Sequence, residues 1–256
     1  NRSLAEVLNW RLIGGFLVGC LAIYGLATLV AMLRKQDIAT AAVEAQCATI
    51  GNVGFLGVPM LTLLMGAEAI GPVMMVLAVD LIVFSSLIVI LITGSRDGRM
   101  HIGVLKTVTL GLLRNPMIVA ISLGFVWSAL EIPIPDPMNE FLAILGGAAT
   151  PGALFAIGAS LAGKSAERVE VALWLTFAKL ILHPLFVAVA VLWLLPIDTY
   201  SASVVIAAAA LPVAGNVYML AQHYGVAPHR ASAAILFSTV ISIATVSVVI
   251  AWVSQL

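Results

Sequence analysis

Eight stretches of mostly apolar residues follow one another along this chain, and no other feature constrains its fold as strongly. A helix needs about 20 apolar residues to cross the hydrocarbon core of a bilayer, and a helix satisfies its backbone hydrogen bonds internally. Short links with Gly, Pro or charged residues separate the stretches. The stretches cover residues 12–33, 39–66, 72–93, 115–131, 138–163, 171–195, 201–224 and 230–253. The sequence therefore predicts an all-α polytopic membrane protein embedded in a lipid bilayer.

Composition excludes several other classes of protein. Hydrophobic residues make up 62% of the chain and charged residues 9%, and a soluble globule could not bury so much apolar surface. The net charge is zero and no basic run occurs, so no nucleic acid is expected as a partner. The sequence has no HExxH or GxSxG motif, and its histidines are scattered. We therefore expect neither an enzyme nor a metal site nor a resident cofactor.

The charges of the links orient the predicted bundle. If each stretch crosses the bilayer once, nearly all Lys and Arg residues gather on one side, and by the positive-inside rule that side is cytoplasmic. The C-terminus then lies outside. The cytoplasmic side collects Arg34, Lys35, Arg96, Arg99, Lys106, Arg114, Lys164, Arg168 and Arg230.

Two strings, GNVGFL at 51–56 and GNVYML at 215–220, read almost alike. A glycine-containing turn near a proline and a Val/Ile-rich stretch follow each string. The shared order pairs 12–33 with 171–195, 39–66 with 201–224, and 72–93 with 230–253. A chance recurrence of GNV in a Gly/Val-rich chain is the alternative.

A five-helix unit used twice explains this order, with the first two helices missing and eight of ten present in the chain. An odd repeat unit forces the two copies to face opposite ways through the membrane, as in many secondary transporters. Residues 1–93 are then the last three helices of the first inverted repeat, 94–114 a cytoplasmic linker with an interfacial helix, and 115–256 the complete second repeat.

The second and seventh stretches are poor continuous helices, because Gly and Pro crowd their middles. A helix break inside hydrocarbon is tolerated where protein or a cavity satisfies the freed backbone. Each break would start a half-helix near the midplane, and two such positive ends facing each other would bind an anion. Kinked helices that pack through glycine are the alternative. The predicted substrate-binding residues are Gly51, Asn52, Gly54, Pro59, Pro212, Gly215 and Asn216.

Three ionisable residues within the stretches are candidates for coupling or a charge relay. Asp80 lies near the middle of the third stretch, where an ionised carboxylate is costly. Lys179 and His183 are four residues apart on one face of the sixth, and Pro184 disturbs the helix beside them. Snorkelling of Lys179 and a purely structural His183 are the alternatives. Three further polar residues, predicted to line an aqueous vestibule, are Glu44, Gln46 and Gln222.

Glycines elsewhere predict close contacts between helices. One seam is expected at Gly15 and Gly19, and another between Gly146 and Gly163.

Several strings resemble the auxin efflux carrier family, bacterial branch, which includes malonate and malate permeases. They are GNVGFLGVP, LLRNPMIVAISLG, ATPGALFAIGASLAG, KLILHP and ALPVAGNVYMLAQHYGV, and the resemblance runs from about Cys47 to the C-terminus. It implies ten helices in two inverted five-helix repeats, a scaffold and a transport domain, and crossing broken helices as the fourth and ninth. It also implies small carboxylate substrates, a bacterial inner membrane, and a substrate site bounded by Asn52, Pro59, Pro212 and Asn216. Pro59 follows its asparagine whereas Pro212 precedes the other, so the two breaks need not be shaped alike.

We therefore expect a secondary active transporter of a small organic carboxylate, working by alternating access around a midplane crossover. No Walker-type loop is present, so a gradient or the substrate itself has to drive transport. The alternatives are a sodium/proton exchanger on a similar fold, with Asp80 as its carboxylate, and a transporter-like sensor or scaffold. The sequence leaves open the carboxylate, the coupling ion (H+ or Na+), the direction and the oligomeric state, a homodimer included.

Overall fold

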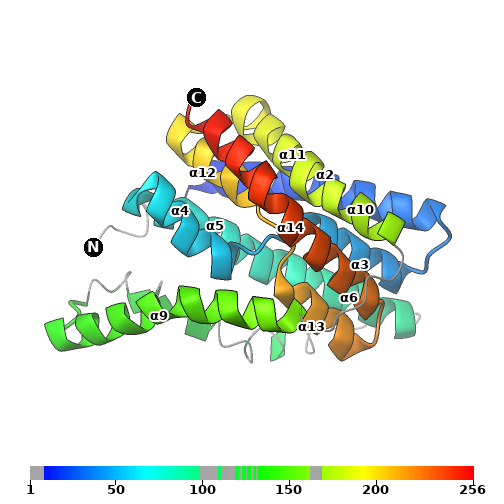
Figure 1. The fold of residues 1–256 in the computed structure, drawn as a ribbon, viewed down its shortest axis with the longest axis horizontal. Coiled ribbons are helices and arrows are strands. Elements are labelled where there is room, and N and C mark those ends of the chain that lie inside the picture. Colours follow the sequence, from blue (N-terminus) through cyan, green and yellow to red (C-terminus); the bar gives the residue numbers. More distant parts are fainter. Residues whose placement is uncertain are drawn as a thin grey trace.

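The computed structural model describes residues 9–97, 132–161 and 169–256, with scattered positions between 109 and 130. Apart from one antiparallel bridge, the regular structure of these residues is helical (Figure 1). The α-helices are α2 (Trp10–Leu33), α3 (Ile38–Thr49), α4 (Val58–Met65), α5 (Ile70–Val79), α6 (Ser85–Asp97), α9 (Asp136–Leu161), α10 (Val169–Phe177), α11 (His183–Val189), α12 (Thr199–Ala209), α13 (Gly215–Tyr224) and α14 (Pro228–Val253). A short 3-10 turn, η2 (Ala67–Ala69), precedes α5.

Four continuous helical segments in the described residues are long and apolar enough to cross a membrane. They are Trp10–Leu33, Ala67–Arg96, Val169–Leu194 and Pro228–Val253. The second and seventh predicted stretches are instead divided, into α3 with α4 and α12 with α13. The chain is therefore a multi-pass membrane protein, and the helix positions agree with the predicted stretches to within a few residues. The stretch 115–131, the interfacial helix expected within 94–114 and Gly163 fall on or among positions outside the described residues.

Single π-helical turns interrupt several of these helices. They are η1 (Val53–Gly57), η3 (Asp80–Phe84), η4 (Ala178–Leu182) and η5 (Ala190–Leu194). The turn η4 ends two residues before Pro184, which removes a helix hydrogen bond, so the disturbance predicted beside His183 is confirmed. Isolated π-turns of this kind are frequent at functional sites, and η3 and η4 contain the two ionisable residues Asp80 and Lys179.

Helices α3 and α12 lie at the centre of the bundle, and nearly all of their residues are buried. Around them the packing repeats: α2 packs on α3 as α11 packs on α12, and α3 packs on α6 as α12 packs on α14. Helix α12 also contacts α5, just as α3 contacts α14. Helix α9 runs along one side of the bundle and contacts η1 (Figure 1).

The predicted seam at Gly15 and Gly19 is confirmed, because both glycines press against α11 and η5. A Cβ atom added at Gly19 would lie 2.7 Å from the Cα atom of Val187, and one at Gly15 would lie 2.9 Å from a methyl group of Val191. The seam predicted between Gly146 and Gly163 is not supported at the two glycines for which contacts are described. A Cβ atom added at Gly146 or Gly147 would have nothing within 4 Å among the described residues.

The Gly19→Ala substitution should destabilise the protein, because its Cβ would collide with the backbone of α11. Overpacking of this kind costs about 1–3 kcal/mol, so the melting temperature in detergent should fall by several degrees. Gly25→Ala on the same helix is the matched control: its Cβ would have nothing within 4 Å, and it should leave the melting temperature unchanged or raise it. Equal melting temperatures for the two variants would contradict this seam.

Candidate functional site

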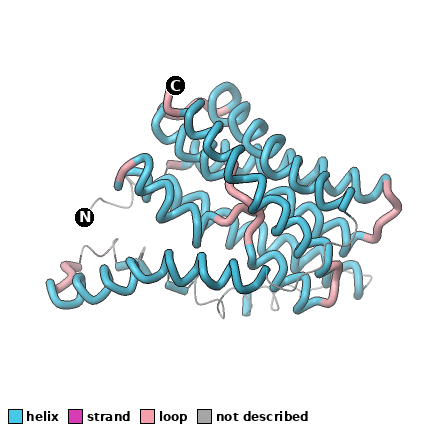
Figure 2. The backbone as a smooth tube through the Cα atoms, in the orientation of Figure 1, coloured by secondary structure: helices cyan, strands magenta, loops and turns pink. Residues whose placement is uncertain are grey.

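The two divided helices cross each other where they are unwound (Figure 2). Helix α3 ends at Thr49, helix α12 ends at Ala209, and the extended segments 50–52 and 212–214 run antiparallel, with a bridge between Gly51 and Val213. The backbone N–H of Asn52 donates to the carbonyl of Pro212 at 2.8 Å. The N–H of Ala214 donates to the carbonyl of Ile50 at 3.1 Å. The predicted interruptions are therefore present, and each supplies hydrogen-bond partners to the other.

Neighbouring helices satisfy further backbone groups at this crossing. The N–H of Val213 donates to the Ser238 hydroxyl of α14 at 3.1 Å. The carbonyl of Ala209, at the end of α12, accepts a hydrogen bond from the Lys179 ammonium at 2.6 Å. The protein thus supplies the partners that unwound backbone lacks in hydrocarbon.

The register of the crossing differs from the expectation that two half-helix starts face each other. Because Asn52 pairs with Pro212 and Ile50 with Ala214, each half-helix begins beside the end of the other divided helix. The starts of η1 and α13 consequently lie at opposite edges of the crossing. Each positive helix end is next to a negative one.

The two edges differ in how much room they offer. At the α13 edge, Ala214 provides no side-chain cap, a Cβ at Gly215 would meet nothing within 4 Å, and the Oδ1 atom of Asn216 is buried without a partner. At the η1 edge, where a side-chain cap is likewise absent, a Cβ added at Gly57 would lie 2.7 Å from a methyl group of Leu211, so less room is open there. The α13 edge is the one with unused polar groups next to open space.

The other predicted substrate-binding residues lie at the crossing or just beyond it. Asn52 is 6% exposed and makes no side-chain cap for η1. Gly51 and Pro212 are buried within the paired segments, whereas Gly54 and Pro59 are half-buried on η1 and α4. The prediction placed these residues around two breaks that face each other, and the structure distributes them over the two opposite edges of the crossing.

A buried polar chain runs from the crossing into α2. The Lys179 ammonium lies 2.8 Å from Nδ1 of His183, and Nε2 of His183 lies 3.2 Å from Sγ of Cys20. A charged Lys179 has only donors, so Nδ1 accepts and the proton of a neutral His183 lies on Nε2, directed at Cys20. The predicted pairing of Lys179 with His183 on one helix face is present, and Lys179 does not snorkel because it is fully buried.

Asp80 is also buried, with 3% of its surface exposed, and its Oδ1 atom has no hydrogen-bond partner. It lies close enough to Lys179 for their charges to interact, although no direct ion pair between them is present in the described structure. The three residues predicted to couple transport therefore belong to one buried region beside the crossing.

The predicted vestibule residues do not share one environment. Glu44 is fully buried on α3 and forms ion pairs with Arg34 and Arg230, at the end of α2 and the start of α14. Gln46 is buried too, whereas Gln222 is exposed. Glu44 thus holds three helices together in this conformation, and an aqueous vestibule at its depth stays a prediction.

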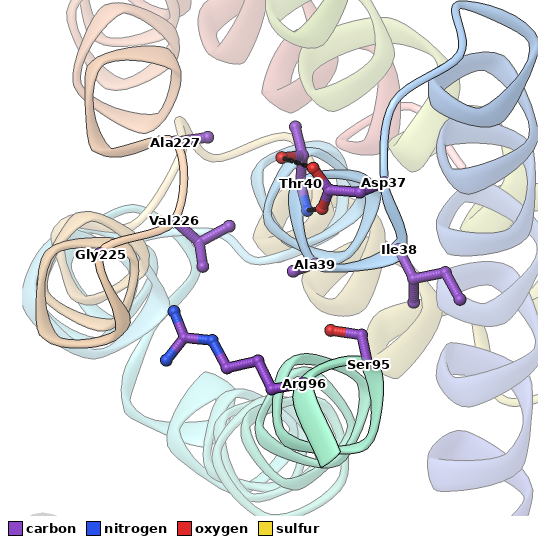
Figure 3. A pocket seen from close by; sticks show the side chains of 9 residues that line it. All are labelled: Asp37, Ile38, Ala39, Thr40, Ser95, Arg96, Gly225, Val226 and Ala227. Atoms are coloured by element: carbon purple, nitrogen blue, oxygen red, sulfur yellow. Dashed lines mark hydrogen bonds between the residues drawn. The ribbon is translucent and has the colours of Figure 1, made fainter. Parts of the chain in front are cut away.

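A cleft of about 600 Å3 opens at the same end of the bundle (Figure 3). The start of α3, the end of α6 and the loop between α13 and α14 line it, with Arg96 directed toward that loop and donating to the carbonyl of Tyr224. Asp37 caps α3 there, and the hydrogen bond from the Thr40 backbone lowers the pKa of its carboxyl group. None of the predicted site residues lines this cleft, so it is separate from the crossing.

Sequence reasoning missed three residues that the structure brings to these clusters. Ser238 supports the crossing, Cys20 faces His183, and Arg230 pairs with Glu44. Each lies far along the chain from its partner, and no local pattern signals such a contact. Among the contacts in these clusters, the sequence predicted only that of Lys179 with His183, because residues four apart share one face of a helix.

Comparison with known proteins places the chain among transporters. Residues 1–250 match the family described as membrane transport proteins. A Rhizobium meliloti (strain 1021) protein named "Putative malonate transporter" is 30% identical over 220 residues, which cover 84% of this chain and 68% of the relative.

Replacing Glu44 by Gln should destabilise the protein, because two arginines would lose their buried counterion. Breaking a buried ion pair costs about 3–5 kcal/mol, and partial exposure of the arginines reduces this to about 2 kcal/mol. Thermal unfolding in detergent measures the effect. Glu170→Gln, at an exposed position on α10, is the control and should unfold like the wild type; a Glu44→Gln variant as stable as this control would contradict the role of the ion pairs.

Proposed function

Because the chain belongs to the auxin efflux carrier family of membrane transport proteins, we propose that it is a secondary active transporter of a small organic carboxylate. The observation that carries the proposal is the crossing of two divided helices inside a membrane bundle, with an uncapped helix start and, at the same edge, an asparagine whose Oδ1 atom has no partner. Binding sites of secondary transporters are typically built from such interrupted helices. The relative from Rhizobium meliloti is named for malonate, so malonate is the first substrate to test.

We also propose that the helices form two inverted five-helix repeats, with eight of the ten helices in this chain. The packing pattern supports this, because the contacts of α2, α3 and α6 recur for α11, α12 and α14. With the charge asymmetry of the links, the arrangement favours a bacterial inner membrane, with Arg34, Arg96 and Arg230 on the cytoplasmic side and the C-terminus outside.

The substrate carboxylate is proposed to bind at the α13 edge of the crossing. A helix start offers backbone N–H groups and the positive end of the helix dipole, which together favour an anion. The side-chain amide of Asn216 adds a donor in the first turn, and Gly215 leaves room for a ligand to approach the backbone. Asn52 lies at the opposite edge and would act mainly on the shape of the crossing.

Alternating access then follows from movement of the crossing with the helices bonded to it. Ser238 joins the crossing to α14 and Lys179 joins it to η4, so these elements would move together. Helix α9 contacts η1 beside the crossing, and it would belong to the part that stays fixed.

Substitution of Asn216 by Ala should reduce uptake of labelled malonate into proteoliposomes by about 10- to 100-fold, the effect of losing a hydrogen bond to a charged group. Asn52→Ala should reduce uptake less, and Asn139→Ala, an exposed control on α9, should not change it. Unchanged uptake in both Asn52→Ala and Asn216→Ala would reject the assignment of the site. Malonate that binds saturably to the wild type but does not cross the membrane would favour a sensor.

A sodium/proton exchanger is the second candidate, because Asp80 is a buried carboxylate with a free oxygen inside a π-turn. An exchanger needs such a carboxylate to carry its ion. Asp80→Asn should abolish cation exchange if this candidate is right, and the wild type should then show sodium flux without malonate. We expect instead that the wild type shows malonate flux and no sodium flux on its own.

A further inference from the structure

We propose that Ser238 on α14 is a positioning residue for the carboxylate site at the start of α13. Its hydroxyl group holds the unwound segment 212–214, and the shape of that segment sets how well the site binds its ligand. The inference rests on the proposed transport function and names a residue that acts on the site through the backbone. It assigns to α14 a part in substrate affinity as well as in packing.

The pairing of the two unwound segments leaves one backbone donor directed away from the crossing. Gly51 and Val213 face each other, and the hydrogen bonds between the segments are made by their neighbours on either side. In an antiparallel pair of this kind, the two facing residues direct their own N–H groups outward. The N–H group of Val213 therefore cannot bond to segment 50–52, and it donates to Oγ of Ser238 at 3.1 Å.

The hydroxyl group of Ser238 is well placed to accept this hydrogen bond. The side chain has no exposed surface, and its Oγ atom donates at 3.2 Å to the carbonyl of Ile235 in the same helix. A hydroxyl group has one proton and two acceptor lone pairs. With the proton directed at Ile235, the oxygen is left as an acceptor for Val213. Replacing Ser238 by Ala would remove the acceptor of a buried N–H group, which is costly.

This hydrogen bond lies next to the proposed site. Ala214 follows Val213 and is the N-cap residue of α13, with an extended backbone at φ −73° and ψ 140°. The backbone angles of segment 212–214 thus set the direction in which the first N–H groups of α13 point. Those groups bind a carboxylate best when they are oriented toward it before the ligand arrives. If Val213 had to find another acceptor, the segment would turn and the N–H groups would turn with it.

The chain offers two matched control positions. Ser242 lies one turn after Ser238 on α14 and is 6% exposed, but its Oγ atom donates to the carbonyl of Thr239 within the same helix. Ser203 on α12 is 5% exposed and donates at 3.1 Å to the carbonyl of Val253 on α14. A change of either serine to alanine removes a buried hydroxyl group without removing a partner of segment 212–214. Ser203 also controls for the loss of a hydrogen bond between helices.

The first experiment measures the kinetics of malonate uptake in proteoliposomes. Ser238→Ala should raise KM about 10-fold and leave the maximal rate within about twofold, because ground-state binding is what it weakens. Ser203→Ala and Ser242→Ala should leave KM unchanged. Ser238→Thr keeps the hydroxyl group and should keep KM within about threefold of the wild type, even if its extra methyl group lowers the melting temperature. An unchanged KM in Ser238→Ala, or equal increases in all three alanine variants, would overturn the inference and leave the proposed function intact.

The second experiment needs no ligand and measures hydrogen exchange of the purified protein in detergent. Ser238→Ala should speed the exchange of the amides of residues 213–217 by about 10-fold or more, because the segment is no longer held. Ser242→Ala should exchange like the wild type there. Equal exchange in the two variants would overturn the inference. If the wild type moves no malonate, the proposed function fails, and this experiment still decides whether Ser238 holds the segment.

A further variant covers the case in which Ser238→Ala does not fold. Ser238→Cys preserves the shape of the side chain but offers only a weak acceptor. It should shift KM and the exchange of residues 213–217 in the same direction as Ser238→Ala. A folded Ser238→Cys variant with wild-type KM and wild-type exchange would overturn the inference.

Discussion

The pairing of two unwound backbone segments inside the bundle is the constraint on which the rest of this structure depends. Hydrocarbon offers no hydrogen bonds, so a helix can be interrupted there only if other protein groups accept and donate in its place. The segments 50–52 and 212–214 do this for each other, which obliges α3 and α12 to meet at the centre. Both helices are rich in alanine, whose small side chain allows such a close approach.

The same constraint recruits side chains from the surrounding helices. Ser238 completes the hydrogen bonding of Val213, and Lys179 completes that of Ala209. A crossing held in this way is stiff, because bending either segment would leave buried N–H or carbonyl groups without partners. If the crossing moves relative to α9, a rigid displacement of the bonded helices therefore costs less than a local rearrangement of the unwound segments.

The sequence predicted the parts of this arrangement that depend on local chemistry. Gly51 and Pro212 interrupt apolar stretches, and helix propensity alone indicates a break at each. The π-turn that begins at Asp80 contains no proline or glycine that would indicate it in the sequence. The register of the crossing depends on which backbone carbonyl of one segment pairs with which N–H group of the other, and this pairing is set by the three-dimensional structure. The ion pairs of Glu44 join residues far apart in sequence, so a pattern within one helix could not reveal them.

The distribution of charge inside the bundle bears on the proposal of an anionic substrate. Glu44 is matched by Arg34 and Arg230, and Asp80 together with the negative end of α12 is matched by Lys179. Within the described structure, the uncapped start of α13 is then an end whose partial positive charge no side-chain cap offsets. The end of α3 lies beside this start and offsets part of its charge, and a carboxylate bound in the space next to Gly215, as proposed, would offset more of it.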